Sequence, residues 1–358
     1  MNTVETKNTK ASLKEWPSNG LERVEACPIC EGQARHLYAG LTDRVFRCAP
    51  GHWDMYQCDT CGTAYLDPRP TLETIHLAYQ RYYTHNEPVH QQTTALPGWR
   101  RHIRALANGY RNSRYGANLE PSNRMGAWLL LLAPNYRQAL DRELRYLPPL
   151  LRDGSLLDVG FGSGAFLRLA QRVGWRVSGV DPDPVAVTNG IKAGLDVRRG
   201  GINAFADAAE KFDVITLNHV IEHVHDPVET ISQAYTLLKP GGRLYIETPN
   251  VNSYGSQRFK EFWRGLEPPR HLILFNWASM NSVLRRCGFQ VDYAIGSFAN
   301  YASIAHASKV IRDNGDPYQK KYISVLDKLV GFMLRIYPFS QKERTEFITV
   351  IATKQERQ

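Results

Sequence analysis

The sequence predicts an α/β fold, in which a largely parallel sheet carries helices on both faces and a smaller module precedes it. Two observations support this prediction. Between residues 156 and 291, short apolar runs alternate with helical patterns, as in sheets built from strand–helix units. Ahead of this region stand two Cys-x-x-Cys pairs, at residues 27–30 and 58–61.

The first predicted strand ends in a glycine-rich turn within residues 156–164, Leu-Leu-Asp-Val-Gly-Phe-Gly-Ser-Gly. Gly160, Gly162 and Gly164 let the backbone approach a ligand closely, because no Cβ intervenes. Residues 165–173 are expected to form a helix. The turn therefore predicts a nucleotide-sized notch at a helix N-terminus.

The charges beside this turn distinguish two classes of ligand. Gly160, Gly162 and Ala165 loosely satisfy the dinucleotide pattern Gly-x-Gly-x-x-Gly/Ala. Asp158 would repel a pyrophosphate, whereas it suits S-adenosylmethionine, which has an ammonium and a cationic sulfonium but no phosphate. The run Asp-x-Gly-x-Gly-x-Gly from 158 to 164 therefore favours S-adenosylmethionine over NAD.

Other predicted strands end in polar residues that could meet at one site. These strands are expected at 176–180, 212–217, 243–248 and near 346–353, with a helix at 231–238. Asp181 follows one strand, where a carboxylate can bind the ribose hydroxyls of adenosine. Residues 218–223 and 247–250 follow two others. Ligands of such sheets bind outside the carboxyl ends of the strands, so these residues are expected to converge with Asp158.

Taken together, these segments resemble the class I S-adenosylmethionine-dependent methyltransferases, whose sheet is Rossmann-like. The matching pieces are residues 157–164, 179–181, 212–215, 219–227 and 238–242. The resemblance covers residues 156–291 with the last strand, and it implies S-adenosylmethionine as cofactor. The cofactor contacts that it implies, by position, are Asp158, Gly160, Phe161, Gly162, Gly164, Asp181, Pro182, Asn203, Asn218 and His219.

One position departs from the pattern of that family. Many of its members carry an Asp after the third strand that meets the adenine amine, and the equivalent residue here is Gly201. The adenine contact is then made by backbone or by Asn203, or it is absent.

The paired cysteines predict a structural zinc site formed by Cys27, Cys30, Cys58 and Cys61. A pair of disulfides is the alternative in an oxidising compartment. In another arrangement, Cys48 and His52 replace one of the two pairs. With residues 65–71 and a helix expected to reach Tyr83, this region resembles the zinc-ribbon module of a methyltransferase subgroup found in sugar, surface-polysaccharide and natural-product pathways.

These patterns divide the 358 residues into five parts. They are a flexible tail (1–20), a zinc-ribbon module (21–70), a helical Arg-rich region (71–152), a methyltransferase core (153–295 and 345–355) and a helical insertion (296–344). Helices in the insertion are expected at 302–312 and 318–334, as a substrate lid or a dimer contact. The N-terminus has no apolar leader run, which predicts a cytoplasmic protein. The longest apolar stretch, 127–133, is too short to span a bilayer and is expected to be a buried helix or an interfacial segment.

Residues 99–152 carry most of the excess positive charge. They hold ten arginines against three acids and account for about seven of the nine net positive charges. A solvated helical face explains such a segment. The alternative is a surface for an anionic partner, whether a nucleotide sugar, a lipid-linked phosphate, a membrane or RNA. Arg100, Arg101 and Arg104 share a helical face and are the first candidates for phosphate contacts.

Transfer of a methyl group to a hydroxyl usually requires a base, for which histidine is suited near neutral pH. The candidate catalytic residues are His271, His219, His223 and Glu222. His219 and His223 share a face if their segment is helical. His271 follows two prolines in the loop 265–272 and resembles a Pro-x-His element that lies over the acceptor in relatives, so it is the favoured base. The candidate substrate contacts outside residues 99–152 are Arg270, Asn250 and Trp263, and each of the three could instead have a structural role.

The function expected from these features is methyl transfer to a hydroxyl of a small, anionic molecule, such as a sugar, a nucleotide sugar or a natural-product intermediate. A C-methyltransferase is one alternative, because the same base could remove a proton beside a carbonyl. An RNA methyltransferase that uses the zinc ribbon and the arginines is another. Residues 218–221 lack the Asn/Asp-Pro-Pro-aromatic signature of enzymes acting on exocyclic amines of bases, which argues against RNA.

Overall fold

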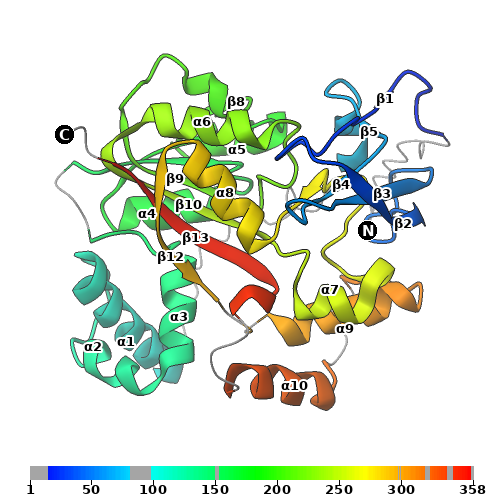
Figure 1. Ribbon diagram of the computed structural model, residues 1–358. Helices are drawn as coiled ribbons and strands as arrows, with labels where there is room; N and C mark the ends of the chain where they lie inside the picture. The colour runs from blue at the N-terminus through cyan, green and yellow to red at the C-terminus, as the bar shows by residue number, and fades with distance from the viewer. Residues whose placement is uncertain are drawn as a thin grey trace, which may run out of the picture.

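The computed structural model describes residues 15–80, 98–149, 153–296, 298, 300–318, 323–336 and 342–355. Its centre is a seven-stranded sheet in the order β12-β13-β10-β9-β6-β7-β8 (Figure 1). The strands are β6 (Ser155–Val159), β7 (Arg176–Asp181), β8 (Asp196–Arg199), β9 (Phe212–Asn218), β10 (Leu238–Pro249), β12 (Phe289–Ile295) and β13 (Phe347–Lys354). Five neighbours from β10 to β8 run parallel, whereas β13 pairs antiparallel with both β10 and β12.

Helices cover both faces of this sheet, which confirms the predicted α/β fold. All five residues of β6 are buried, as expected for a strand that is covered on both sides. Two adjacent residues of this strand, Leu156 and Leu157, belong to two different hydrophobic cores. The core around Leu156 includes residues of α4 (Ala165–Arg172) and α5 (Pro184–Lys192), and the core around Leu157 includes residues of α6 (Pro227–Leu237) and α8 (Trp277–Arg286).

The N-terminal module is joined to this core by a shared sheet. β2 (Ala34–Leu41), β3 (Trp53–Cys58) and β4 (Ala64–Leu66) form a sheet that β11 (Ile273–Leu274) completes from the core. A short ribbon pairs β1 (Leu21–Glu22) with β5 (Arg69–Pro70). The helix expected to reach Tyr83 is only the 3-10 turn η1 (Ile75–Tyr79), and residues 81–83 lie outside the described chain.

A three-helix body made of α1, α2 and α3 lies at the lower left of Figure 1. Its elements are α1 (Gly98–Tyr115), α2 (Gly126–Leu129), the 3-10 turn η3 (Leu130–Leu132) and α3 (Pro134–Glu143). A Cβ built on Gly126 would lie 1.9 Å from the carbonyl oxygen of Leu106, so α2 packs against the backbone of α1 only because this residue is glycine. No helix among the described residues is long and apolar enough to cross a membrane.

The region between β12 and β13 is helical, as expected from its pattern. It contains α9 (Tyr301–Arg312), α10 (Val325–Ile336) and the turn η6 (Lys342–Arg344). α9 packs against α7 (Tyr254–Phe259) and η5 (Lys260–Phe262) from the core. α10 begins seven residues after the expected position 318, and residues 319–322 lie outside the described chain. The remaining short element is the 3-10 turn η4 (Ile202–Phe205) after β8.

Candidate functional site

The glycine turn after β6 has the backbone that its sequence predicts. Gly160, Gly162 and Gly164 have φ angles of 69°, 54° and 70°, in the left-handed region that favours glycine. A Cβ on Gly160 would lie 2.5 Å from Cγ2 of Val220, so a side chain does not fit there. Gly164 is followed directly by α4, which places the turn at a helix N-terminus. The turn therefore exposes backbone at the edge where the parallel strands end.

Two buried carboxylates flank this turn. Oδ2 of Asp181 accepts a hydrogen bond of 2.8 Å from the backbone N–H of Gly162, and its Oδ1 accepts from Asp183. Oδ1 of Asp158 accepts from Thr216 at 2.9 Å and forms an ion pair with Arg145. Burial raises the pKa of both carboxyl groups, and their hydrogen bonds oppose this shift.

A cleft of about 700 Å³ opens beside the carboxyl ends of β9 and β10. One wall comes from α3 and α4, and the other from the ends of the two strands. Its lining includes Asn218, His219, Glu247, Arg142 and Arg172. The cleft has the size expected for a small-molecule site.

His219 lies between two carboxylates at the floor of this cleft. Its Nδ1 is 3.4 Å from Oε1 of Glu222 and its Nε2 is 3.4 Å from Oε1 of Glu247. The imidazole is 36% exposed, whereas both carboxylates are buried. His219 also has a φ of 56°, a strained conformation for a residue with a side chain. Segment 219–226 is a series of turns, so the expected helical face shared by His219 and His223 is wrong.

The two carboxylates make this histidine unusually basic. Burial favours the neutral imidazole, but the hydrogen bonds and charges of Glu222 and Glu247 outweigh it and raise the pKa of His219 to about 9. Burial opposes ionisation of Glu222 as well, and the His219 interaction lowers the pKa of that carboxyl to about 2. The three groups therefore form an anion–cation–anion row at neutral pH.

Arg142 holds the Glu247 carboxylate from the side of α3. Its Nε lies 3.0 Å from Oε2 and its Nη2 lies 2.5 Å from Oε1 of Glu247, a bidentate contact. Tyr245 and Thr349 donate to the same carboxylate from β10 and β13. The orientation of Glu247 toward His219 is thus fixed by three elements.

The comparisons with known proteins agree with this geometry. A family model described as a methyltransferase domain matches residues 132–294. This chain contains a class I methyltransferase domain. The match begins within η3, so it includes α3 and its arginines together with the glycine turn, Asp181 and His219.

The curated relatives match a part of this chain. The ubiquinone biosynthesis O-methyltransferase of Pseudomonas entomophila is 36% identical over 104 residues, which are 27% of this chain and 45% of that protein. The enzyme of the same name from Cereibacter sphaeroides is 39% identical over 119 residues, 31% of this chain and 47% of that protein. This chain thus spans less than half the length of these relatives.

Solved structures also include similar chains. Phosphoethanolamine N-methyltransferase 2 of Haemonchus contortus, in complex with S-adenosyl-L-methionine, is 20% identical. Its TM-score is 0.44, over 62% of this chain and 53% of that one.

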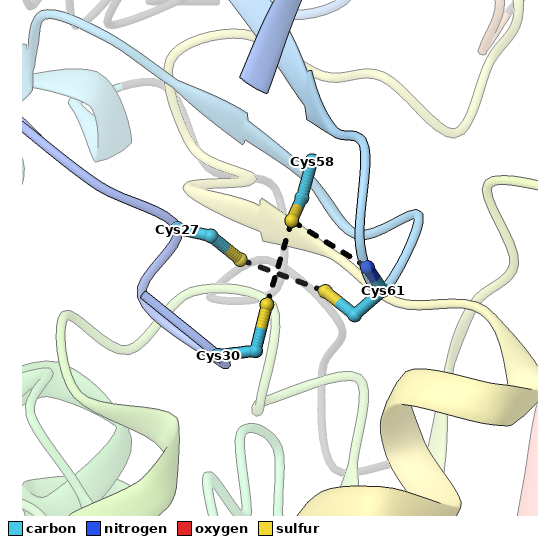
Figure 2. Close-up of side chains that lie close together, drawn as sticks. All are labelled: Cys27, Cys30, Cys58 and Cys61. Carbon is cyan, nitrogen blue, oxygen red and sulfur yellow. Dashed lines mark hydrogen bonds between the residues drawn. The ribbon is translucent and has the colours of Figure 1, made fainter. Parts of the chain in front are cut away.

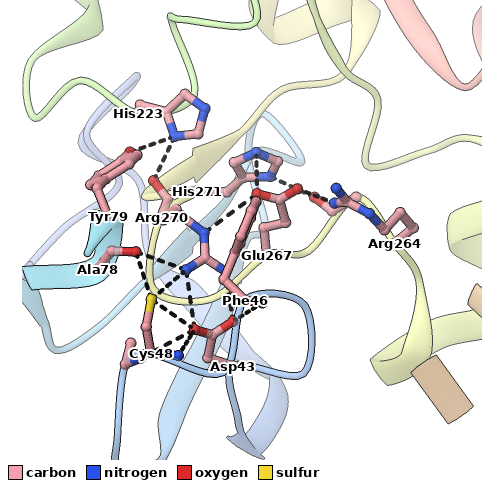
Figure 3. Close-up of polar contacts among 12 residues, drawn as sticks. Asp43, Phe46, Cys48, Ala78, Tyr79, His223, Arg264, Glu267, Arg270 and His271 are labelled. Atoms are coloured by element: carbon pink, nitrogen blue, oxygen red, sulfur yellow. Dashed lines mark hydrogen bonds and ion pairs between the residues drawn. The ribbon is translucent and has the colours of Figure 1, made fainter. Parts of the chain in front are cut away.

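The other candidate histidines of the methyltransferase domain, His223 and His271, lie next to each other (Figure 3). His223 donates from Nδ1 to the carbonyl of Arg270 at 2.9 Å, and the same atom is 3.0 Å from the Tyr79 hydroxyl. The His271 ring packs 4.7 Å from the His223 ring and donates from Nδ1 to the carbonyl of Gly265. His271 is only 5% exposed and does not line the cleft, and burial lowers its pKa to about 4.

Three expected substrate contacts are buried and have structural partners. Arg270 is fully buried between Asp43 and Glu267, as Figure 3 shows, so a substrate cannot reach its guanidinium. Asn250 is also fully buried and donates to two carbonyls before β13. Trp263 packs in the core. The substrate role expected for these three residues conflicts with their burial.

Several of the remaining expected contacts lie on accessible surface. Pro182 and Asn203 are exposed near the ends of β7 and β8. Phe161 is buried instead, and its side chain is in the core. Arg100 and Arg101 are exposed on α1, and Arg104 lines a pocket of about 270 Å³ next to the cleft.

The four predicted cysteines of the N-terminal module form one cluster (Figure 2). Cys27 Sγ is 3.6 Å from Cys61 Sγ, and Cys30 Sγ is 3.4 Å from Cys58 Sγ, without a disulfide. Thiolates around one tetrahedral zinc ion at about 2.3 Å would be about 3.8 Å apart, so the donor set fits a metal. The alternative ligands are elsewhere. Cys48 lies against Asp43 and Ala78, and the His52 ring lies against the carbonyl of Gly40.

Sequence reasoning missed the arginines at the end of α3 and in the turn after it. Arg142 and Arg145 were part of a general basic segment, and no spacing rule ties them to Glu247 or Asp158, more than ten residues away. Tyr79, which lies beside His223, carries no local signal either. Only the folded chain shows that these side chains belong to the cleft or its supporting shell.

Proposed function

We propose that this protein transfers a methyl group from S-adenosylmethionine to a hydroxyl of a small, anionic metabolite such as a sugar, a nucleotide sugar or a natural-product intermediate. The observation that carries this proposal is the basic, accessible His219 held between Glu222 and Glu247 in a cleft beside the glycine turn. A base at this place can take the proton that an oxygen acceptor must lose.

The glycine turn and Asp181 bind the cofactor in this proposal. The backbone of residues 160–164 faces its amino-acid end, and Asp181 has lone pairs left for the ribose hydroxyls. Asp158 is fully buried in an ion pair with Arg145, so it positions the end of β6 and does not make the direct cofactor contact that the sequence predicted. Pro182 and Asn203 border the adenosine side. The sulfonium of the bound cofactor supplies the methyl group, and the cleft aligns it with the acceptor oxygen while excluding water.

His219 replaces His271 as the proposed base. His271 is buried, and its Nδ1 proton is committed to a backbone carbonyl. His219 is accessible, and Glu222 and Glu247 stabilise the imidazolium that forms when it accepts a proton. His223 contacts the Tyr79 hydroxyl and the carbonyl of Arg270, and both side chains act as positioning residues for the turn after β9.

The arginines around the cleft support an anionic acceptor. Arg172 lines both the cleft and the neighbouring pocket and has no hydrogen bond or ion pair with another described residue. Arg104 lines the same neighbouring pocket. An acceptor with a phosphate or carboxylate could place this anionic group against Arg172 and Arg104 and its hydroxyl at His219. The names of the curated relatives, O-methyltransferases, favour oxygen as the accepting atom.

We further propose that the four-cysteine cluster holds a structural zinc ion. Four protein ligands leave no open position for chemistry, so the ion would stabilise the module and not take part in the reaction. Residues 296–344 are proposed as a substrate lid, because Asn300 at the start of α9 lines the cleft.

The test is a methyl-transfer assay with labelled S-adenosylmethionine and a panel of sugars, nucleotide sugars and phenols. His219→Gln should lose most turnover while it binds the cofactor normally in calorimetry. His52→Gln, an exposed histidine outside the cleft, is the matched control. Binding of NAD in place of S-adenosylmethionine would overturn the proposal, as would label that enters only RNA. Carbon-bound methyl in the product, seen by NMR, would favour the C-methyltransferase alternative.

A further inference from the structure

The three-helix body presents a group of large apolar side chains to solvent. We call this group the apolar tip; its members are Met125, Trp128, Leu129, Leu131 and Leu132 of the α2–η3 segment. Trp128 is 76% exposed and Leu132 is 85% exposed. Single exposed leucines are ordinary, but five large apolar residues within eight positions indicate a contact surface.

The exposure of the apolar tip is built into the fold. Gly126 fixes α2 against the backbone of α1, and Leu130 points inward to pack with Ala107, Tyr110 and Leu140. Residues on either side of Leu130 therefore point outward. The expectation of a buried helix at 127–133 is wrong, and the interfacial alternative agrees with this arrangement.

The helical body that carries the apolar tip has several arginines without acidic partners. No acidic residue occurs between 98 and 119 or between 121 and 140. Arg100, Arg101, Arg124 and Arg137 have no ion pair with any residue that the structure describes. Of the three acids of this body, Asp141 accepts hydrogen bonds from two tyrosines, Tyr110 and Tyr115, and Glu143 pairs with Arg111.

We propose that the apolar tip docks on the surface of an anionic lipid bilayer. Aromatic and leucine side chains beside arginines are typical of helices that lie in the headgroup region, where the apolar groups enter about 5–10 Å and the cations meet lipid phosphates. The charge pattern argues against a second copy of this chain. A two-fold interface would bring the arginines of both copies together, whereas anionic lipid neutralises them.

This docking would place the cleft beside the membrane. α3 begins two residues after the apolar tip, and Gln138 and Arg142 of the same helix line the cleft. The helix has ten residues and is about 15 Å long. An acceptor carried in or near the lipid surface could therefore reach the cleft without long diffusion, but the lipid contact itself does not depend on the proposed reaction.

The test is flotation of the full-length protein with vesicles of phosphatidylcholine alone or mixed with phosphatidylglycerol. The protein should float with the anionic vesicles, and added salt should release it. Trp128→Ser/Leu132→Ser and Arg124→Glu/Arg137→Glu should each reduce the bound fraction about tenfold or more. Ile191→Ser is the control, because Ile191 is 60% exposed on α5, a helix in the upper half of Figure 1 and apart from the three-helix body at the lower left.

The other outcomes would overturn the proposal. Equal binding of wild-type protein to neutral and anionic vesicles would do so, as would unchanged binding of both double variants. Light scattering that shows a dimer, lost in the Trp128→Ser/Leu132→Ser variant without any vesicle binding, would assign the apolar tip to a second copy. Circular dichroism and calorimetry with S-adenosylmethionine separate a folding defect from lost lipid contact, since neither should change in these surface variants.

Discussion

The Nε2 atom of His219 lies 3.4 Å from Oε1 of Glu247, although these residues belong to the ends of two different strands. The parallel register of β9 and β10 sets Asn218 opposite Glu247, which brings the next residue, His219, to that carboxylate. Glu222 reaches the other ring nitrogen because the turns after β9 fold back toward β10. The sheet thus brings together His219 and the two carboxylates that make it basic, although the spacing of these residues in the sequence matches no catalytic motif.

Turnover should rise with pH toward 9 in the wild-type protein. Only the neutral imidazole of His219 can accept a proton, and its pKa of about 9 keeps it charged at neutral pH. Glu247→Gln removes one stabilising carboxylate, so the pKa of His219 should fall and the rising limb should move to lower pH. The measurement is the pH dependence of kcat in both proteins. If kcat rises over the same pH range in Glu247→Gln as in the wild type, the group that titrates is not His219.

Folding stability should depend on the same histidine. The pKa of His219 is raised in the folded state, so its contribution is fully present below its unfolded value of about 6.5 and is lost as pH rises through about 9. Urea unfolding across that window should show falling stability in the wild-type protein. His219→Gln should have a flatter profile between these pH values. If the unfolding free energy of both proteins falls with pH to the same extent, His219 is not the group that causes the pH dependence.

Asp181→Ala should weaken binding of S-adenosylmethionine about tenfold or more, because it removes charge-assisted hydrogen bonds. It should also loosen the turn, since Asp181 accepts from the N–H of Gly162. Calorimetric titration gives the dissociation constant. Asp207→Ala, with an exposed carboxylate after η4, should bind the cofactor as the wild type does. An unchanged constant for Asp181→Ala would remove the ribose assignment.

Removal of zinc should unfold the N-terminal module. The cluster ties the loop before β2 to the turn between β3 and β4. The free energy of binding a structural zinc ion then contributes directly to the folding of this module. Elemental analysis should find about one zinc per chain, and Cys61→Ser should lose it and melt earlier. Cys287→Ser, whose sulfur lies by Ser232 in the core, should keep its zinc. If the metal-free protein melts at the same temperature as the zinc-loaded protein, the module folds without the ion and the prediction is wrong.

The strand–helix order could be predicted because it depends on local patterns. The glycine turn, the buried run of β6 and Asp181 all depend on residues within a short window, and their positions are confirmed by the structure. The catalytic assignment of His271 rested on a local resemblance, and the structure buries that histidine. Whether His219 or His271 faces solvent depends on how β11 and the loop before it pack on the N-terminal module, which no short window encodes.

The same limit explains the misassignment of Arg270 as a substrate contact. Its partner Asp43 lies 227 positions away, in the N-terminal module, and the two side chains share hydrogen bonds at 2.6 and 3.1 Å in the interior. An arginine in a loop after two prolines is more often accessible. Here the shared sheet of β4 and β11 carries that loop beneath the module.

The Arg270–Asp43 pair should therefore hold the module to the core. Both side chains are almost completely buried, and Asp43 is the nearer of the two carboxylates that neutralise Arg270, the other being Glu267. Asp43→Asn removes the closer charge partner of a buried cation and should cost about 3–5 kcal/mol of unfolding free energy. The matched control is Asp59→Asn, which breaks an exposed pair with Arg35 and should cost at most about 1 kcal/mol. Urea denaturation measures both. A contact that anchors the module must be more costly to break than a surface ion pair. If Asp43→Asn loses no more unfolding free energy than Asp59→Asn, the Arg270–Asp43 pair does not hold the module to the core.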